Sequence, residues 1–359
     1  MLQIIPLDNR RCRSASRQRD RGQVRDPSAG EWSDAVERNN KPTSLTFRPF
    51  RHSDYDQLVE LAQVSADRDS VQWDGSDFYH LRYGDPEFFR DGEFQPERDV
   101  WIAAEGRRVV GVCGALGYTS LVSHGVVELW GPLIHPNHRK QGLGKMMTTM
   151  AIHSARRFAG CTLQKWLPST WDSIGISLVG KFGFYRRRCK REMVRHLPWR
   201  PRTRPRSTGT RIHVVSKTKD FEEATALHKE LQASYPNGGT MDLTPDRLKS
   251  MARDPLWRTE VLLARFAGRP AGIAFCQLAS GSIEGYISDL GVLQQYRRQN
   301  IGKLLLAEAL DRLGIQGAKS VMVDIDLDNA VGYQLAKHFR FRPERDVFLY
   351  ERPIKQDAD

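Results

Sequence analysis

The stretch HRKQGLGKMM, residues 138–147, places Gly142 and Gly144 one residue apart, with basic side chains beside them and an apolar run after them. It follows VVELWGPLIHP, residues 126–136, which is rich in apolar residues and predicts a strand. The residues that follow have helical spacing up to Arg157. A strand that enters a glycine loop and then a helix presents free backbone N–H groups and the positive end of the helix dipole. Because glycine has no Cβ to keep an anion away from the backbone, the stretch predicts a loop for phosphate or pyrophosphate.

Two familiar phosphate loops are excluded by their spacing. A P-loop needs glycine five residues before Gly144, where the chain has Arg139, and Ser or Thr after Lys145, where it has Met146. A dinucleotide-binding fingerprint needs a third glycine at the position of Met147. The loop therefore belongs to another class of anion-binding turn.

The loop and the elements around it occur twice in the chain. An offset of 158 relates these pairs: Arg139 and Arg297, Leu143 and Ile301, Gly144 and Gly302, Lys145 and Lys303, Met147 and Leu305. Such self-similarity predicts two copies of one α/β unit. The expected organisation is a disordered extension (1–44), an N-terminal domain (45–198), a Pro/Arg linker (199–210) and a C-terminal domain (211–359).

The periodicity of each copy predicts a sheet flanked by helices. Strands are expected in the first copy at 45–51, 99–106, 109–118, 126–136, 162–169 and 187–197, and helices at 52–64, 143–157 and 172–182. In the second copy we expect strands at 211–215, 259–268, 270–278, 286–293, 321–327 and 346–354, and helices at 220–232, 243–253, 301–314 and 330–339. The predicted fold class is α/β, with two tandem domains that each hold a mixed, mostly antiparallel sheet.

Charge is concentrated in one segment. The net charge is +12, and residues 181–211 hold twelve basic residues against one acid, Glu192. This segment predicts a contact with RNA or another polyanion, or steering of an anionic ligand; a solvated linker is the alternative reading. The five cysteines form no CxxC pair, and there is no long apolar run, which favours a cytoplasmic protein without structural zinc or a membrane span.

The motif R-x-x-G-x-G of residues 139–144, after a strand and before a helix, resembles that of the GNAT superfamily of acetyl-CoA-dependent N-acetyltransferases. Both copies resemble the family in element order, and Gly183-Phe184 and Arg340-Phe341 lie where the family has its Gly-Phe motif. The resemblance implies two tandem domains of this family. It also implies that acetyl-CoA donates an acetyl group to an amine, without a metal.

The resemblance implies that backbone amides of each loop hold the pyrophosphate of coenzyme A, and that the strand end pairs with its pantetheine arm. In the first copy the implied residues are Ile134, Arg139, Lys140, Gln141, Gly142, Leu143, Gly144 and Lys145. In the second copy they are Val292, Arg297, Arg298, Gln299, Asn300, Ile301, Gly302 and Lys303. Asn300 replaces the first glycine, and Asn tolerates left-handed backbone geometry better than most residues.

Candidate catalytic residues follow from the same resemblance. Histone-acetylating members of the family place a general-base glutamate eleven residues before the loop arginine, which is Glu128 here. A partly exposed glutamate paired with an arginine is the alternative reading. The second copy has Tyr286 at that position, with Asp289 as a substitute base. The family's general-acid tyrosine would fall at Val179 and Ala336, so Tyr333 is only a weak candidate for the acid.

The expected function is acyl-CoA-dependent transfer of an acetyl group to a primary amine. The competing reading is a non-catalytic acyl-CoA-sensing or RNA-associated protein, favoured by the missing tyrosines and the basic segment. Residues 68–95 and 233–256 are the segments most suited to line the acceptor pocket. The acceptor, the active copy and the oligomeric state stay open at this point.

Overall fold

The computed structural model describes residues 45–69, 95–117, 125–158, 160–168, 173–198, 208–233, 243–254 and 257–355. The N-terminal extension and most of the predicted linker therefore lie outside the described residues. The same holds for much of the two segments that we expect to line the acceptor pocket.

The N-terminal half, residues 45–198, follows the predicted order of elements. It contains β1 (Leu45–Pro49), η1 (His52–Asp54), α2 (Tyr55–Asp69), α5 (Pro96–Asp99), β2 (Val100–Glu105), β3 (Arg108–Leu116), β4 (Val126–Ile134), η3 (Pro136–His138), α7 (Leu143–Ala155), η4 (Arg156–Phe158), β5 (Thr162–Pro168), α8 (Ser173–Lys181) and β6 (Tyr185–His196). The turn between β2 and β3 is formed by Gly106 and Arg107, and Gly106 has a φ of 60°. Glycine suits this turn because it adopts positive φ without steric cost.

The C-terminal half, residues 208–355, repeats the arrangement. It contains β7 (Thr210–Val214), α9 (Thr218–Ala233), α10 (Pro245–Arg253), β8 (Trp257–Phe266), β9 (Arg269–Ala279), β10 (Glu284–Val292), η5 (Gln294–Tyr296), α11 (Ile301–Gln316), β11 (Ser320–Asp326), α12 (Ala330–His338) and β12 (Arg342–Pro353). The predicted helices and strands are confirmed in both halves. The short helix α5 was not expected, because four residues carry no periodicity.

The twelve strands of the described residues form one sheet in the order β1-β2-β3-β4-β5-β12-β6-β11-β10-β9-β8-β7. Neighbouring strands are antiparallel except for the pairs β4–β5 and β10–β11. The mixed α/β class with a mostly antiparallel sheet is therefore confirmed. The two halves do not, however, form two separate sheets.

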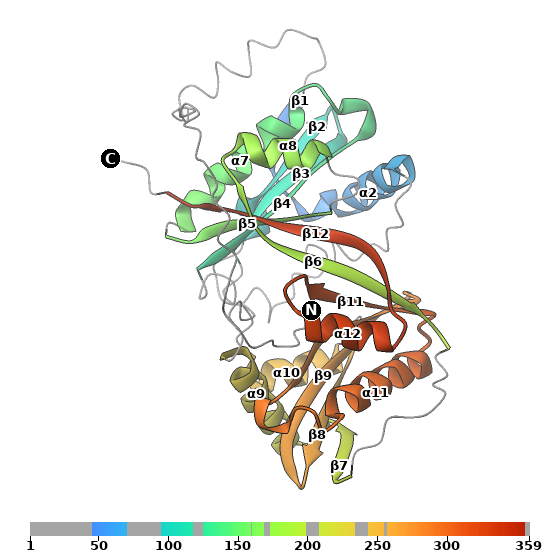
Figure 1. The fold of residues 1–359 in the computed structure, drawn as a ribbon. Helices are drawn as coiled ribbons and strands as arrows, with labels where there is room; N and C mark the ends of the chain where they lie inside the picture. Colours follow the sequence, from blue (N-terminus) through green and yellow to red (C-terminus); the bar gives the residue numbers. More distant parts are fainter. Residues whose placement is uncertain are drawn as a thin grey trace.

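The last strands of the two halves are exchanged (Figure 1). Strand β12 of the C-terminal half pairs with β5 of the N-terminal half, with Leu349 opposite Trp166. Strand β6 of the N-terminal half pairs with β11, with Met193 opposite Val323. The two exchanged strands also pair with each other in the middle of the sheet. Each half therefore completes its sheet with a strand from the other, which the sequence did not lead us to expect.

Charge complementarity accompanies this exchange. Arg188 of β6 forms an ion pair with Asp326 of β11, and Arg191 Nε lies 2.7 Å from Asp346 Oδ1 of β12. Arg345 of β12 in turn pairs with a carboxylate of β6. Part of the basic segment that predicted a polyanion contact is thus used inside the protein. The contact itself stays a prediction.

Helices cover both faces of the sheet. Buried residues of α7 and α8 form one apolar cluster with the N-terminal half of the sheet, and α2 forms another on the opposite face. In the C-terminal half, α11 and α12 lie on one face, and α9 and α10 lie on the other. Met193 is fully buried among the residues of the C-terminal cluster, although it belongs to the N-terminal half. The exchanged strand therefore contributes to the core as well as to the sheet.

Candidate functional site

In each half, two parallel strands separate after a short pairing. Residues 126–128 of β4 pair with 162–164 of β5, and residues 284–286 of β10 pair with 320–322 of β11. Beyond these points, the edge of β4 that faces β5, and the edge of β10 that faces β11, have no strand partner among the described residues. Each half thus offers a main-chain edge that can accept an extended ligand, because no neighbouring strand engages the N–H and C=O groups of that edge.

The open edge leads in both halves to the loop that the sequence singled out. Gly142 has a φ of 87°, and Asn300 has a φ of 60° at the equivalent position. Lys140 and Arg298 share a φ of 62°. Asn300 therefore adopts the left-handed conformation that the turn requires, and the two loops have matching backbone geometry.

The first arginine of each loop holds the loop against its strand. Arg139 Nε donates to the carbonyl oxygen of Ile134 at 3.0 Å, and Arg297 Nε donates to that of Val292 at 3.3 Å. The same contact in both halves fixes the loop relative to the open edge. These arginines thus organise the predicted cofactor site through their side chains, while their own backbone N–H groups donate to the carbonyl oxygens of Pro136 and Gln294.

The other predicted cofactor residues lie in the loop and the first helical turn. Leu143 and Ile301 begin α7 and α11 and have buried side chains, so they offer a ligand only their backbone. The first N–H groups of a helix have no partner within the helix. The residues of this set are Lys140, Gln141, Gly142, Leu143, Gly144 and Lys145, and Arg298, Gln299, Asn300, Ile301, Gly302 and Lys303.

Glu128 lies at the point where β4 and β5 separate. It is the last residue of β4 that pairs with β5, and Gln164 lies opposite it. Because Val127 and Leu129 are buried in the α7 cluster, alternation along the strand places Glu128 on the α2 face. Gln164 Nε2 donates to Glu351 Oε1 at 2.8 Å. A carboxylate from the exchanged strand β12 thus lies next to the predicted base position.

Tyr286 occupies the equivalent position in the C-terminal half. Its hydroxyl donates to Asp324 Oδ2 at 3.0 Å. Burial, followed by the charge of Asp324, raises the pKa of Tyr286 well above its usual value, so the phenol stays neutral. The other oxygen of Asp324, Oδ1, is buried and has no hydrogen-bond partner among the described residues.

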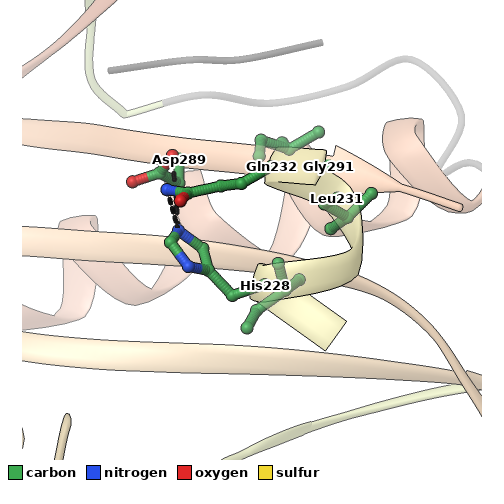
Figure 2. A pocket seen from close by; sticks show the side chains of 7 residues that line it. His228, Leu231, Gln232, Asp289 and Gly291 are labelled. Carbon is green, nitrogen blue, oxygen red and sulfur yellow. Dashed lines mark hydrogen bonds and ion pairs between the residues drawn. The ribbon is translucent and has the colours of Figure 1, made fainter. Parts of the chain in front are cut away.

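Asp289, the substitute base, lines a pocket between β10 and α9 (Figure 2). His228 of α9 is 4% exposed, and its Nε2 lies 3.9 Å from Asp289 Oδ1. Gln232 Nε2 lies 3.2 Å from the same histidine nitrogen. Burial lowers the pKa of His228 below its usual value, and Asp289 opposes this shift only in part. The imidazole is therefore neutral at neutral pH and is placed to accept a proton.

His228 was not found from the sequence. It lies on the apolar stripe of its helix with Ala224, Leu227 and Leu231, where a histidine is indistinguishable from a core residue. The strand that carries Asp289 has a bulge between Ile287 and Asp289, and this bulge can be seen only in the structure. The pairing of His228 with Asp289 is thus a product of the fold.

Lys190 of the exchanged strand β6 also faces this region. Its backbone lies opposite Asp326, and its side chain is buried, with Nζ 4.4 Å from the centre of the Trp166 ring. Burial lowers the pKa of Lys190 to about 8, while Asp324 and the other nearby carboxylates oppose the shift.

The predicted acid position is filled by packing residues. Val179 and Ala336 are both buried in apolar clusters. Tyr333 of α12 packs against the C-terminal cluster, and its ring centre lies 5.6 Å from Lys337 Nζ and 5.8 Å from Arg191 Cζ. No contact of Tyr333 with the residues around Asp289 is seen among the described residues. Tyr333 remains a weak candidate for the acid.

Two further features concern only the described residues. They contain no group of three or more His, Cys, Asp or Glu side chains that could hold a metal ion. None of their helices has the length and apolar character needed to cross a membrane.

Comparison with known proteins finds similarity in both halves. The model of the acetyltransferase (GNAT) family matches residues 62–184 and 224–341. A mycothiol acetyltransferase of Renibacterium salmoninarum is 24% identical over 312 residues, which cover 84% of this chain and 88% of that protein.

Solved structures show the same fold. A GCN5-related N-acetyltransferase from Sphaerobacter thermophilus has a TM-score of 0.65 at 19% identity, and the match covers 89% of this chain and 99% of that one. A tandem GNAT protein from the clavulanic acid biosynthesis pathway has a TM-score of 0.66 at 16% identity, and the match covers 88% of this chain and 100% of that one. The tandem arrangement thus occurs in a solved structure.

Proposed function

Since the chain belongs to the GNAT family of acetyltransferases, we propose that it transfers an acetyl group from acetyl-CoA to a primary amine by direct attack. Acyl transfer is the activity of the family, and the donor and the acceptor are the parts that we add. The observation that carries the proposal is the pair of separating strands, each followed by a left-handed loop at a helix N-terminus.

The open strand edge and the loop of each half, named here the N-terminal cleft and the C-terminal cleft, have residues that fit acetyl-CoA. The open edges of β4 and β10 offer N–H and C=O groups to the amides of the pantetheine arm. The loop amides at Gly142 and Asn300 would bind the pyrophosphate, and Lys140, Lys145 and Arg298 would add positive charge. Acetyl-CoA supplies an activated carbonyl carbon and a thiolate leaving group.

In the C-terminal half, His228 and Asp289 provide the base. An amine acceptor is mostly protonated at neutral pH, and it must lose a proton before its nitrogen attacks the carbonyl carbon. The neutral imidazole of His228 accepts this proton, and Asp289 stabilises the imidazolium that forms. Attack gives a tetrahedral adduct whose nitrogen still carries one extra proton. The C–S bond then breaks, the sulfur leaves as a thiolate, and this extra proton passes from the nitrogen to the thiolate, which leaves a neutral amide. A thiol pKa of about 8.5 makes a dedicated acid dispensable, consistent with Val179 and Ala336 at the tyrosine positions.

In the N-terminal half, Glu128 is the proposed base. It lies where β4 and β5 separate, and the thioester end of acetyl-CoA bound along the open edge would lie at this point. Since the two loops have matching geometry, the loop does not favour one half over the other. The pocket with His228 and Asp289 leads us to favour the C-terminal half as the catalytic one.

Calorimetry of acetyl-CoA with the full chain tests this proposal. Gly144→Trp and Gly302→Trp block one cleft each, and neither position has a positive φ, so the change strains no turn. A Cβ added at Gly144 would lie 3.8 Å from Ile134 Cγ1, and one at Gly302 would lie 3.7 Å from Val292 Cγ2, so each tryptophan starts beside the open edge. Lys217→Trp on the exposed surface is the matched control.

Release of coenzyme A thiol is then measured with n-butylamine, ethanolamine, glycinamide and lysine as acceptors. We expect Gly302→Trp to abolish amine-dependent thiol release and Gly144→Trp to leave it. The opposite result would move catalysis to Glu128. Binding without turnover for every amine would favour the alternative of an acyl-CoA-sensing protein.

A further inference from the structure

The side-chain amide of Gln232 reaches into the pocket that His228 and Asp289 line (Figure 2). Gln232 lies four residues after His228 on α9, so the two side chains leave the same side of the helix. Gln232 Nε2 lies 3.2 Å from His228 Nε2, which is within hydrogen-bond distance. One of these two nitrogens therefore donates a hydrogen bond and the other accepts it.

This contact indicates which imidazole nitrogen carries the proton. The amide nitrogen of glutamine only donates, whereas a neutral imidazole has one donor and one acceptor nitrogen. His228 Nε2 is therefore the acceptor, and the proton of the neutral ring lies on Nδ1. Burial, which lowers the pKa of His228, favours this neutral ring at pH 7.

Asp289 favours the opposite tautomer. Its Oδ1 lies 3.9 Å from the same Nε2, and it could accept a hydrogen bond only if Nε2 carried the proton. A separation of 3.9 Å is too long for a hydrogen bond, whereas the 3.2 Å contact with Gln232 is not. The ring of Phe275 packs edge-on against the imidazole, with centres 5.4 Å apart, and fixes its plane. Gln232 thus decides the tautomer of His228.

The two acceptors of the pocket suit a primary ammonium. With the proton on Nδ1, His228 Nε2 and Asp289 Oδ1 both accept, and they are close enough for one nitrogen to donate to both. A primary ammonium carries three N–H donors, so it can donate to both acceptors and offer the third N–H to the amide oxygen of Gln232.

We propose that Gln232 is a positioning residue of the acceptor site: its amide keeps Nε2 of His228 free of a proton and holds the place of the acceptor's primary ammonium until the acceptor binds. This rests on the proposed function, in which His228 is the base. When the acceptor binds, one of its N–H groups replaces that of Gln232 on Nε2. That proton then passes from the acceptor nitrogen to Nε2, which leaves a neutral amine and an imidazolium protonated on both nitrogens.

The first test is the position of the proton on the His228 ring. Nuclear magnetic resonance is applied to the full chain labelled with ¹⁵N in the histidine rings, and the His228 signals are identified by their loss in His228→Gln. At pH 7 we expect the proton on Nδ1 in the wild type and on Nε2 in Gln232→Met, because methionine has nearly the length of glutamine but no N–H donor. Lys229→Met, on the exposed side of α9, is the matched control. A wild-type proton on Nε2, or one that stays on Nδ1 in Gln232→Met, would overturn the proposal.

The second test is displacement of the Gln232 amide by an acceptor. Ethanolamine is added to the wild-type protein saturated with coenzyme A, and the Nε2 signal of His228 is followed. We expect this signal to shift as the ammonium replaces the amide. A signal that stays fixed at ethanolamine concentrations that saturate turnover would contradict the assigned place of the acceptor nitrogen.

The third test is turnover with ethanolamine. One hydrogen bond changes a tautomer equilibrium about 2- to 12-fold, so Gln232→Met should lower kcat by about this factor and leave the Michaelis constant for acetyl-CoA unchanged. Gln232→Glu keeps the size but cannot donate, so it should lower kcat further. It should also move the acidic limb of the pH profile to higher pH, because a carboxylate favours the imidazolium.

A role of Gln232 in packing alone would leave kcat unchanged in both variants, since both keep the size of the side chain. Absence of turnover in the wild type with every amine would refute the proposed function instead. The position of the ring proton would still decide whether Gln232 selects the tautomer of His228.

Discussion

Replacing Met193 by alanine should destabilise the C-terminal half, although Met193 belongs to the N-terminal half of the sequence. Its side chain is fully buried and packs in one cluster with Leu262, Leu305 and Val323. Removing such a side chain costs about 2–5 kcal/mol, because the apolar contacts are lost and a cavity remains. Val194→Ala is the matched control. Val194 is only partly buried and lies on the other face of the same strand, so we expect a loss of about 1 kcal/mol.

Urea unfolding gives the total loss, and hydrogen exchange followed by mass spectrometry locates it. Met193→Ala should speed exchange in peptides from α11 and β11, while peptides from α7 and β3 keep the wild-type rate. Faster exchange confined to α7 and β3 would mean that β6 packs in its own half. That result would refute the strand exchange.

Five further substitutions, at four positions, test the site. Glu128→Gln should lower turnover 10²- to 10⁴-fold if the N-terminal half is catalytic, as expected for the loss of a general base. It should leave turnover unchanged if the C-terminal half is the catalytic one, and steady-state kinetics distinguish the two outcomes. Asn300→Gly should leave the dissociation constant of acetyl-CoA in the C-terminal cleft nearly unchanged, because glycine adopts the same left-handed φ, whereas Asn300→Val should weaken binding as measured by calorimetry. His228→Gln should remove a loss of stability at acid pH. Burial lowers the pKa of His228, so the unfolded chain binds the proton first as pH falls. The free energy of unfolding of the wild type therefore falls as pH drops from about 6.5 through the folded pKa, and that of the variant should not. Lys190→Met should raise the free energy of unfolding at pH 7 by about 3 kcal/mol, because burial disfavours the charged ammonium. This gain should shrink as pH rises from about 8 to 10.5, where the lysine loses its proton in both states. An equal stability of the two proteins at pH 7 would show that the ammonium is not buried.

The sequence predicted the elements and the loops, because these depend on local spacing. Residues 139–144 and 297–302 carry their own backbone requirements, and the structure places both loops at a helix N-terminus. Asn300 adopts the left-handed turn because asparagine tolerates it, which the sequence left open.

The partners of the last strands were not predictable from local patterns. Alternation along β6 indicates which side chains share a face, but it does not identify the neighbouring strand. Here that choice is accompanied by ion pairs of Arg188 and Arg191 with residues about 140 to 155 positions away. For the same reason Lys190 seemed to belong to a solvated basic run, and His228 to an apolar helix stripe.

The exchange of β6 and β12 has a consequence for folding during synthesis. The N-terminal half needs β12, residues 342–353, to cover the edge of β5, so its sheet stays incomplete until these residues have left the ribosome. During synthesis, β5 and β6 present unpaired edges of the kind that recruit other strands. We expect the final folding step to wait for the synthesis of β12, and a chain truncated before residue 342 to associate with chaperones or aggregate.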